Sequence, residues 1–438
     1  MPTKSRTEQL LNAYINGDDI SNFVPLSRNE QILKDMILGN EQTSSPQSRI
    51  ESLYKKLDEK IKQGSGGGDN PLQYVIDNLA GDGKPSCEYL FYKYQGSSLD
   101  DVLTKIDTSK VTSMNYMFYN CPNLTIIPQF NTNSCTSMNN MFGYCSNLTT
   151  VSQLDTSKVT NMSYMFDQCS NLTTIPQLDT SSCTNMNNMF HQCRKIFKIP
   201  LLNTSKVTNM DSMFYYCSNL RKIPLFDTSS CTSMKYMFLE TSISELPLLN
   251  TSKVTNMYNM LSSCNFLTTI PQLDTSSCTD MSYMLSNCEN LTTVPQLDTG
   301  SCTNMCGMFI SCRRLTTISQ LDANSCTDMR YMFNDCRSLT YLKLLNVKAN
   351  LQIGSGTSWG HLIEKDCLIQ IISELIKPSS GTRTLTMGTA NIAKLADTYV
   401  KLLEDDGTGK YPFEVCTSTD EGAMTISDYC TAKNWTLA

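Results

Sequence analysis

A repeat of 24 residues governs most of this chain of 438 residues. One unit reads "LDTSKVTNMSYMFDQCSNLTTIPQ" at 154–177, and the acid or amide of its turn recurs from Asp107 to Asn346. One step, from Asp227 to Asn250, is a residue short and lacks the usual Cys. Self-similarity at a fixed period of this length is the signature of a solenoid, in which each coil buries its apolar residues against its neighbours.

Within a unit, the apolar residues fall into two segments. The L-x-x-I-x-x-L segment at 172–178 predicts a short extended backbone, whereas the M-x-x-M-F segment at 186–190 has a spacing of three that favours a helical or 3₁₀ turn. Coils stacked at about 5 Å per rung would form a rod of about 50 Å. We therefore predict an α/β repeat solenoid of about ten 24-residue leucine-rich-like coils at 107–346, with a degenerate capping repeat at 71–106 and an α+β cap at 347–438.

The chain contains 24 Met and 20 Cys, which most simply fill the core of the solenoid. Met suits irregular apolar gaps, and a redox or metal role for it is the less favoured alternative. Zinc sites need closely paired Cys, whereas here the Cys come one per coil, and a cytoplasmic chain keeps its thiols reduced. We therefore expect buried free Cys, in preference to metal ligands or disulfides. Cys306, beside Gly307, is the one candidate for an exposed thiol.

We call the set of equivalent residues in successive coils a column. Cys occurs in two such columns. In the second column, Cys alternates with Val in the earlier coils. The first column holds Cys121, Cys145, Cys169, Cys193, Cys217, Cys264, Cys288, Cys312 and Cys336, and the second holds Cys135, Cys183, Cys231, Cys278, Cys302 and Cys326.

Two polar columns predict features of the surface. Lys110, Lys158, Lys206 and Lys253 occupy a site that is Ser in the coils between them. Like charges on adjacent strands repel, and skipping a rung separates them by about 10 Å, so this column is expected at an exposed edge. The Asp and Asn column that begins at Asp107 shows no alternation. Its side chains are expected to form Asx turns with the following Thr-Ser, with calcium binding as the alternative.

One site in each coil varies while the core and turn positions hardly change. The two residues before each Cys of the first column read YN, GY, DQ, HQ, YY, SS, SN, IS and ND. Varied and partly aromatic residues at one recurrent site suit a recognition face, because Tyr supplies contact area at a low entropic cost. The alternative is drift on an unselected surface. The predicted recognition residues are Tyr119, Tyr144, Gln168, His191, Tyr215 and Tyr216.

Residues 1–63 contain Ser-Arg-x-Glu three times. Each copy predicts the start of a helix, because the Ser side chain can accept a hydrogen bond from the first turn while the Glu reaches back to the N–H of the Ser. A proline two residues before the second and third copies keeps the approaching chain extended. A Gly-rich linker follows at 64–70.

Short amphipathic helices of this kind need a partner. Residues 1–63 are expected either to pack as a small bundle or, as we favour, to dock on another protein or on copies of themselves. The predicted docking residues are Ser5, Glu8, Pro25, Ser27, Arg28, Glu30, Ile32, Leu33, Pro46, Ser48, Arg49, Glu51, Leu53 and Leu57.

Composition excludes several classes of protein. Charged residues make up 17% of the chain, the net charge is −6, and no basic patch predicts nucleic-acid binding. No run of about 18 apolar residues occurs, and the N-terminus lacks the pattern of a signal peptide, so we expect no membrane insertion and synthesis in the cytoplasm. His191 and His361 lack a nucleophile arrangement, an H-E-x-x-H motif or a phosphate loop. We expect no enzyme, no metal and no cofactor.

Residues 347–438 are expected to close one end of the rod. "EKDCLIQIISELIKP" predicts an amphipathic helix stopped by Pro378, and "TRTLTMG" predicts a strand. "TANIAKLADTYVKLLEDDG" predicts a second helix, and "TISDYCTAKNWTLA" predicts a last helix and a strand. Trp435 in that strand is expected to pack on the last coil and to protect its open edge.

These motifs resemble those of known proteins. "LDTSKVTNMSYMF" and its relatives resemble the BspA-type leucine-rich repeat of bacterial surface proteins, adhesins among them, over about residues 87–346. "PLSRNE" and "PQSRIE" are similar to N-terminal elements of phage head-fibre and tail proteins, and the tail from "RTLTMGTANIAKL" to "AKNWTLA" resembles the closing segment of repeat proteins in phage genomes. The first copy departs from this pattern, because Pro2 lies three residues before Ser5.

The resemblance implies a non-enzymatic phage virion protein, associated with a head fibre or tail. Residues 1–63 would anchor it, as a homo-oligomer, to other proteins of the capsid or tail. The solenoid would then adhere to a glycan or protein of the host surface, with many copies raising the avidity. The alternatives are a bacterial surface or interaction protein with the same repeats, and a purely decorative protein that stabilises a capsid.

Overall fold

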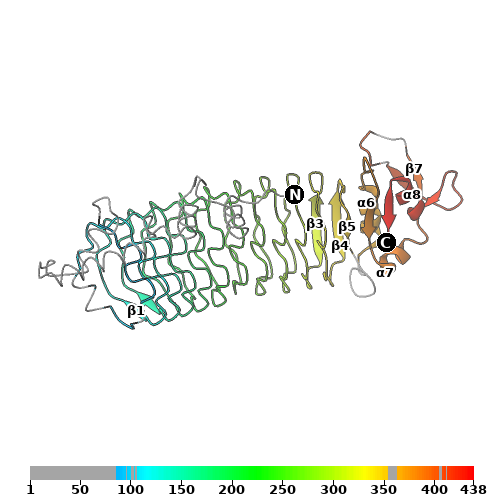
Figure 1. Cartoon of the computed structure of the whole chain (residues 1–438). Coiled ribbons are helices and arrows are strands. Elements are labelled where there is room, and N and C mark those ends of the chain that lie inside the picture. Colours follow the sequence, from blue (N-terminus) through cyan, green and yellow to red (C-terminus); the bar gives the residue numbers. More distant parts are fainter. Residues whose placement is uncertain are drawn as a thin grey trace, which may run out of the picture.

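The computed structural model describes residues 85–94, 96–99, 103, 106–353, 363–403, 407–410 and 412–438. The expectations for the arm at 1–63, the linker at 64–70, much of the capping repeat at 71–106, and His361 fall outside the described residues. Successive described coils stack side by side into an elongated rod, with the C-terminal segment at one end (Figure 1). The observed fold is therefore a repeat solenoid.

Backbone hydrogen bonds hold each coil to both of its neighbours. In the M-x-x-M-F segment, alternate N–H groups donate to the next coil, as Phe118 does to the carbonyl of Met141 at 2.9 Å. Bonds in the reverse direction follow, such as the one from the N–H of Thr136 to the carbonyl of Thr112 at 2.8 Å. Single parallel bridges continue this pairing along the rod from Ser113 onward. Each coil is thus a template for the next one.

The M-x-x-M-F segment consists of consecutive turns. Two residues in each coil, four apart, adopt left-handed backbone angles, as Tyr116 (φ 56°) and Asn120 (φ 57°) do. A turn bond joins the N–H of Tyr119 to the carbonyl of Tyr116 at 3.1 Å. The expectation of a helical or 3₁₀ turn is therefore wrong, because alternate N–H groups donate to the next coil and left-handed residues interrupt any helix. A left-handed residue other than Gly costs about 1–2 kcal/mol, which the bonds between coils must offset.

Strands occupy only parts of the segment predicted to be extended. Strands β1 (Ile126–Ile127) and β2 (Thr150–Val151) form one parallel pair. Strands β3 (Thr317–Asp322) and β4 (Tyr341–Leu345) form another at the far end of the solenoid. In the described coils between β2 and β3, the one bridge within this segment joins Thr293 to Thr317.

Like side chains stack in the core, one per rung. The rings of Phe118 and Phe142 lie parallel with their centroids 5.4 Å apart, and this stack continues through the following coils. The two Met columns, which begin at Met114 and Met117, are fully buried. The prediction that Met fills the core is confirmed.

The first Cys column is also buried and makes a recurrent hydrogen bond. The thiol of Cys193 donates to the carbonyl of Phe166 in the preceding coil at 3.0 Å, and its neighbours in the column repeat this bond. In the coil that lacks Cys, the hydroxyl of Thr241 donates to the carbonyl of Phe238 at 2.9 Å. The thiol therefore satisfies a core carbonyl as well as filling space.

All 20 thiols are free, and all except the half-buried Cys416 are buried. The prediction of buried free Cys is confirmed. The expectation of an exposed thiol at Cys306 is wrong, because this residue is only 7% exposed and its thiol lies 3.6 Å from the hydroxyl of Tyr283.

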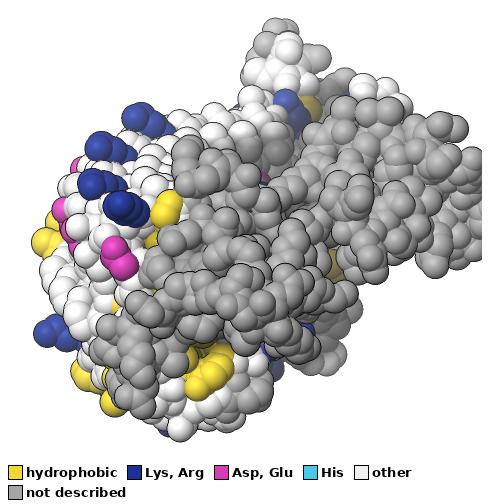
Figure 2. Space-filling view, turned by 60° about the vertical axis from the view of Figure 1, so that its left-hand side comes forward, with side chains coloured by type: hydrophobic (Ala, Val, Ile, Leu, Met, Phe, Trp, Pro, Cys, Tyr) yellow, Lys and Arg dark blue, Asp and Glu magenta, His cyan; other side chains and the backbone are white. Residues whose placement is uncertain are grey.

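The Lys column lies where its alternation predicts. Lys110, Lys158, Lys206 and Lys253 are all exposed. Figure 2 shows basic side chains lined up along one edge of the stacked coils. The prediction of an exposed edge is confirmed.

Helix α6 (Lys365–Ser373) covers the last strand of the solenoid. The side-chain amide of Gln370 donates to the carbonyl of Leu344 at 2.7 Å and accepts from its N–H at 3.3 Å, as a further coil would. Trp435 is buried, but its indole N–H donates to the carbonyl of Ile376 at 2.9 Å. The expectation that Trp435 closes the open edge is therefore wrong, because the side chain of Gln370 pairs with that edge.

The described part of the C-terminal segment contains two small sheets and two further helices. The predicted second helix is too long, because it ends at Lys394 and the β-branched and aromatic "TYV" that follows enters a strand. One sheet has the parallel strands β10 (Trp435–Leu437), β6 (Arg383–Thr386) and β5 (Leu351–Gln352). The other has β7 (Tyr399–Leu402) between the antiparallel strands β8 (Phe413–Cys416) and β9 (Met424–Thr425), and the helices are α7 (Thr389–Lys394) and α8 (Ile426–Ala432).

The buried thiols make the free energy of unfolding fall as the pH becomes alkaline. Burial raises the pKa of Cys183 to about 11 and that of Cys264 to about 12, whereas a thiol in an unfolded chain titrates near about 8.5. Between these values the unfolded chain has lost protons that the folded chain keeps, so the free energy of unfolding falls as pH rises. We expect urea midpoints to drop from pH 8 to pH 10. A variant with Val at Cys135 and Cys183, as in the alternate coils, should lose less, and equal losses would contradict this account.

Candidate functional site

Each coil turns at an Asp or Asn whose side chain binds its own backbone. The carboxylate of Asp155 accepts hydrogen bonds from the N–H and hydroxyl of Ser157 at 3.1 and 2.7 Å, and such turns recur from Asp107 to Asp322. The hydroxyl and N–H of Ser157 lower the pKa of the Asp155 carboxyl. The Asx-turn prediction is confirmed. In the described part of the chain, no group of three or more His, Cys, Asp or Glu is placed to hold a metal ion.

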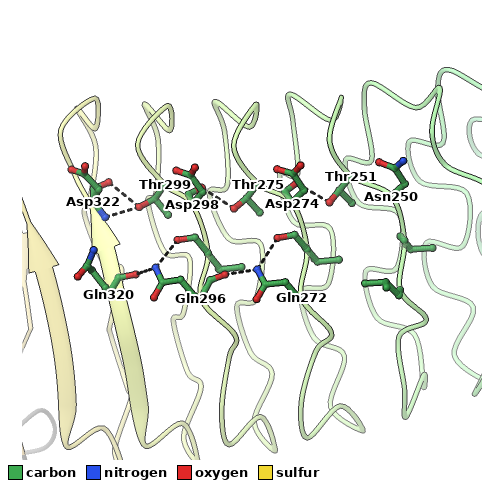
Figure 3. A pocket seen from close by; sticks show the side chains of 14 residues that line it. Asn250, Thr251, Gln272, Asp274, Thr275, Gln296, Asp298, Thr299, Gln320 and Asp322 are labelled. Carbon is green, nitrogen blue, oxygen red and sulfur yellow. Dashed lines mark hydrogen bonds between the residues drawn. The ribbon is translucent and has the colours of Figure 1, made fainter.

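Thr and Gln side chains beside these turns link each coil to the next. The hydroxyl of Thr275 donates to the carbonyl of Asp298 at 2.7 Å (Figure 3). The amide of Gln272 donates to the carbonyls of Gln296 at 2.6 Å and Leu273 at 3.2 Å. In Figure 3 these bonds form two parallel rows along the rod.

A groove follows the Gln and Asp columns and is called the glutamine groove. One length, of about 980 Å³, runs from Leu248 to Asp322, and another, of about 970 Å³, runs from Gln129 to Asp227. Its Thr hydroxyls and many of its Gln amide groups already bind the backbone of their own or the next coil. The groove in these coils is therefore a product of stacking and offers few free donors to a ligand.

An aromatic surface lies on the left-handed turns and is called the tyrosine face. The rings of Tyr92 and Tyr119 are stacked 5.6 Å apart, and a tilted contact of 5.1 Å joins Tyr119 to Tyr144. A second group of contacts begins at His191 and Tyr215, whose rings are 4.8 Å apart. The face comprises Tyr89, Tyr92, Tyr116, Tyr119, Tyr144, Tyr164, Gln168, His191, Tyr215, Tyr216, Tyr236, Tyr258, Tyr283 and Tyr331.

The structure places the six predicted recognition residues on successive turns of this face. Tyr144 and Tyr216 are themselves left-handed, with φ of 63° and 57°, so their side chains project from the turn. Gln168 (φ 55°) lies between the two aromatic groups, and its N–H donates to the carbonyl of His191 at 2.7 Å. Tyr215 touches Tyr216, with ring centroids 4.7 Å apart. That these residues bind a partner stays a prediction.

A second aromatic column of the same face was not predicted. It consists of the Tyr that directly precedes the core Met-Phe or Met-Leu, and it links the aromatic groups of different coils. The ring of Tyr236, for example, lies 6.0 Å from that of Tyr215 and 4.9 Å from that of Tyr258. The signal in the sequence was the recurrence of Tyr at 116, 164, 236, 283 and 331, in the strings "YMF" and "YML".

Two hydroxyls of the tyrosine face are hard to deprotonate. Partial burial, together with neighbouring Tyr and Asp side chains, raises the pKa of Tyr119 to about 12. Burial also raises the pKa of Tyr236 to about 12, together with its hydrogen bond to Tyr258. At Tyr119 and Tyr236 the face therefore presents uncharged rings whose hydroxyls can donate as well as accept.

A His–Asp pair interrupts this aromatic surface. Nδ1 of His191 lies 2.6 Å from a carboxylate oxygen of Asp167, and the two side chains are 20% and 6% exposed. The carbonyl of Asp167 also accepts the N–H of Tyr144 at 2.7 Å. The pair thus fixes the imidazole ring against Tyr215.

The described part of the chain contains no helix of the length and apolar character that crossing a bilayer requires.

Comparison with known proteins identifies the repeat. A family model described as "Mycoplasma protein of unknown function, DUF285" matches residues 85–201, 146–245, 197–291 and 242–344. No curated protein matches the chain.

Several solved structures are similar to the chain. A leucine rich cell surface protein from Faecalibacterium prausnitzii is 17% identical with a TM-score of 0.31, covering 54% of this chain and 83% of that one. A leucine-rich repeat protein from Bacteroides ovatus is 16% identical with a TM-score of 0.31 (56% and 78% covered), and one from Eubacterium ventriosum is 17% identical with a TM-score of 0.34 (54% and 80% covered).

Removing the imidazole of His191 should destabilise the chain, because Asp167 is buried. The substitution His191→Ala leaves that carboxylate without its side-chain partner, so we expect the free energy of unfolding to fall by about 1–3 kcal/mol. His191→Asn is the matched control, since its amide can donate from nearly the same place and should recover much of the loss. Urea unfolding measures both variants. Equal midpoints for His191→Ala and the parent chain would mean that the pair does not stabilise the turn.

Proposed function

The chain belongs to the family described as "Mycoplasma protein of unknown function, DUF285", and we propose that it is a non-enzymatic recognition protein whose solenoid presents the tyrosine face to a glycan or protein on a cell surface. The observation that carries this proposal is the run of partly exposed rings on successive turns, with neighbouring centroids between 4.7 and 6.2 Å apart. A surface built in this way can contact several units of a repetitive ligand at once.

The chemistry of the face favours binding. Tyr has few rotatable bonds, so ordering its ring on a partner costs little entropy, and its hydroxyl adds hydrogen bonds to the contact. Packing against neighbouring rings restricts the side chains further before a ligand arrives. Because the residue pairs before the first Cys column differ from coil to coil, the face has a pattern that a specific partner can match.

The absence of catalysis is part of this proposal. His191 is held by Asp167, and no nucleophile is recorded in contact with it among the described residues. Burial raises the pKa of the thiols of the second Cys column, as at Cys183 and Cys231, both to about 11, which disfavours the reactive thiolate.

The finer proposal is that residues 1–63 anchor the chain in a phage virion. It rests on the Ser-Arg-x-Glu segments and on the resemblance of both ends of the chain to phage proteins. In this account the arm binds capsid or tail proteins, and several copies on one particle raise the avidity for the host surface.

The alternative is a bacterial surface or interaction protein that uses the same tyrosine face. The description of the family, which names the bacterium Mycoplasma, favours it. In both accounts the solenoid is the part that recognises a partner, so the two differ only in what the arm binds.

Truncating the tyrosine face should abolish recognition. We expect the double variant Tyr215→Ala and Tyr216→Ala to bind host cells at least about tenfold more weakly, because it removes rings from the middle of the face. Tyr341→Ala is the matched control, since Tyr341 is 40% exposed but lies on β4, outside the tyrosine face. Binding of labelled protein to cells measures the effect. Equal losses for both variants would contradict the assignment of the face.

Deleting residues 1–63 should separate anchoring from recognition. We expect the full chain to co-sediment with phage particles that lack it and the deletion variant to stay in solution, while both still bind cells. A circular dichroism spectrum of the deletion variant checks that the solenoid is folded. If neither chain binds particles and both bind cells, the virion proposal fails and the bacterial alternative holds.

A further inference from the structure

Three consecutive coils replace the Gln of the glutamine groove with Leu. Gln177 precedes them and Gln272 follows them in this column. Leu201, Leu225 and Leu248 stand in its place and are 63%, 62% and 64% exposed. They lie where the two lengths of the groove meet, because the first two line one length and the third lines the other. We call these three residues the leucine strip.

The leucine strip lacks a hydrogen bond that other coils make at this site. A Gln at this site donates to the backbone of the next coil, as Gln177 does to the carbonyl of Leu201 at 2.7 Å. Leu cannot make this bond, and it also exposes apolar surface to water. A contiguous apolar patch on an otherwise polar surface marks a place where another molecule binds.

Basic residues flank the strip in the same coils. Lys198 and Lys222 are exposed on adjacent coils, in a column that is Thr at 174 and 269. Lys222 pairs with Glu245 at 2.8 Å, whereas no ion pair of Lys198 is recorded in the described part of the chain. Lys110, Lys158, Lys206 and Lys253 avoid such neighbours by skipping a rung, because like charges on adjacent strands repel. Glu245 occupies the column of Lys198 and Lys222 in the third coil and offsets the charge of Lys222, so Lys198 is the cation that an acidic partner would neutralise.

The spacing of the strip matches the pitch of an α-helix. The core rings of these three coils lie 5.7 Å apart, from Phe190 to Phe214 and from Phe214 to Phe238, which is close to the rise of about 5.4 Å per turn of an α-helix. Residues one turn apart on a helix therefore meet successive leucines in register over three rungs. An extended strand presents side chains on one face about every 6.6 Å and would drift out of register.

We propose that the leucine strip docks an amphipathic α-helix of another protein, with an aliphatic stripe on Leu201, Leu225 and Leu248 and acidic residues facing Lys198 and Lys222. This site goes beyond the recognition function assigned to the tyrosine face, because it lies on a different part of each coil. The binding mode is that of a helix laid in a groove, in which aliphatic anchors at i, i+4 and i+7 enter the apolar floor.

Other occupants fit the charges less well. A flat anionic bilayer would meet the exposed carboxylates of Asp155, Asp179 and Asp274, which line the groove on both sides of the strip. The turns of the three coils of the strip hold Asn203, Asp227 and Asn250, so a helix laid on the strip itself meets one carboxylate there. The segments that begin at the Ser-Arg-x-Glu copies carry equal numbers of acidic and basic residues at 5–16 and 27–38, and the one at 48–63 is basic, with five Lys or Arg against three Asp or Glu.

A displayed library of helical peptides tests the proposal on the full chain. Each peptide has about 18 residues, or five turns, with a fixed Leu stripe and randomised polar positions. We expect enrichment of peptides whose polar positions are net acidic. These should bind the triple variant Leu201→Gln, Leu225→Gln and Leu248→Gln at least about tenfold more weakly than the parent chain. The triple variant restores the residue of the neighbouring coils, so it should fold, which its thermal unfolding checks.

A second pair of substitutions tests the charges. Lys198→Thr and Lys222→Thr also restore the neighbouring coils' residue, and together they should weaken binding of acidic peptides and reduce its dependence on salt. The tyrosine-face variant Tyr215→Ala and Tyr216→Ala should bind the peptides as the parent does. Loss of cell binding and loss of peptide binding therefore report on separate proposals.

Four results would overturn the docking proposal. They are enrichment of neutral or basic peptides, or of none; equal affinity for the parent and the triple Gln variant; binding of phosphatidylglycerol vesicles but of no peptide; and preferential binding of a synthetic peptide of residues 48–63. The last two would assign the strip to a membrane or to this chain's own arm.

Discussion

The register between coils is the constraint on which the rest of the structure depends. Backbone N–H groups of one coil bind carbonyls of the next, so each residue is placed beside its equivalents in the coils before and after it. Every column must therefore tolerate contact with its own kind. Phe stacks on Phe, Met packs on Met, and Thr and Gln donate to the neighbouring backbone, so these columns extend the rod at no electrostatic cost. Like charges on adjacent coils repel, and Lys occupies alternate coils, whereas the carboxylates of the Asp column are each hydrogen-bonded within their own turn.

The Cys column illustrates how a column can satisfy two demands at one position. The site is fully buried and small, and the carbonyl of the Phe in the preceding coil points at it. A thiol is apolar enough for the core and can still donate a hydrogen bond, whereas Ala would leave the carbonyl without this donor. Thr241 meets the demand differently, since its hydroxyl bonds to Phe238 in its own coil. That solution occurs in the step from Asp227 to Asn250 that is one residue short.

The features of the fold that could be predicted from the sequence are the ones that form such columns. The solenoid, the buried Met and Cys, the Asx turns and the exposed Lys edge were all predicted, because each is a property that repeats every 24 residues. The consecutive turns were not, because their left-handed positions hold Tyr, Gln, Ser, Lys and Glu as well as Asn and Asp, and in the described coils Gly307 is the one glycine among them. The pairing of Gln370 with Leu344 was missed as well, since a single contact outside the repeat leaves no periodic signal.

Departures from a column are the most informative positions in such a protein. A substitution that breaks a column loses a bond or a packing contact that the neighbouring coils keep, so it persists only where something else compensates for it. Drift would scatter such breaks along the rod. Here they gather in the coils from Lys198 to Leu248, where Gln becomes Leu, Thr becomes Lys, one Cys is absent and one step is shortened. Thr241 and the shortened step are accommodated inside the coil, whereas the exposed Leu and Lys replace residues that fit in the flanking coils, which is why we assign them to the binding of another molecule.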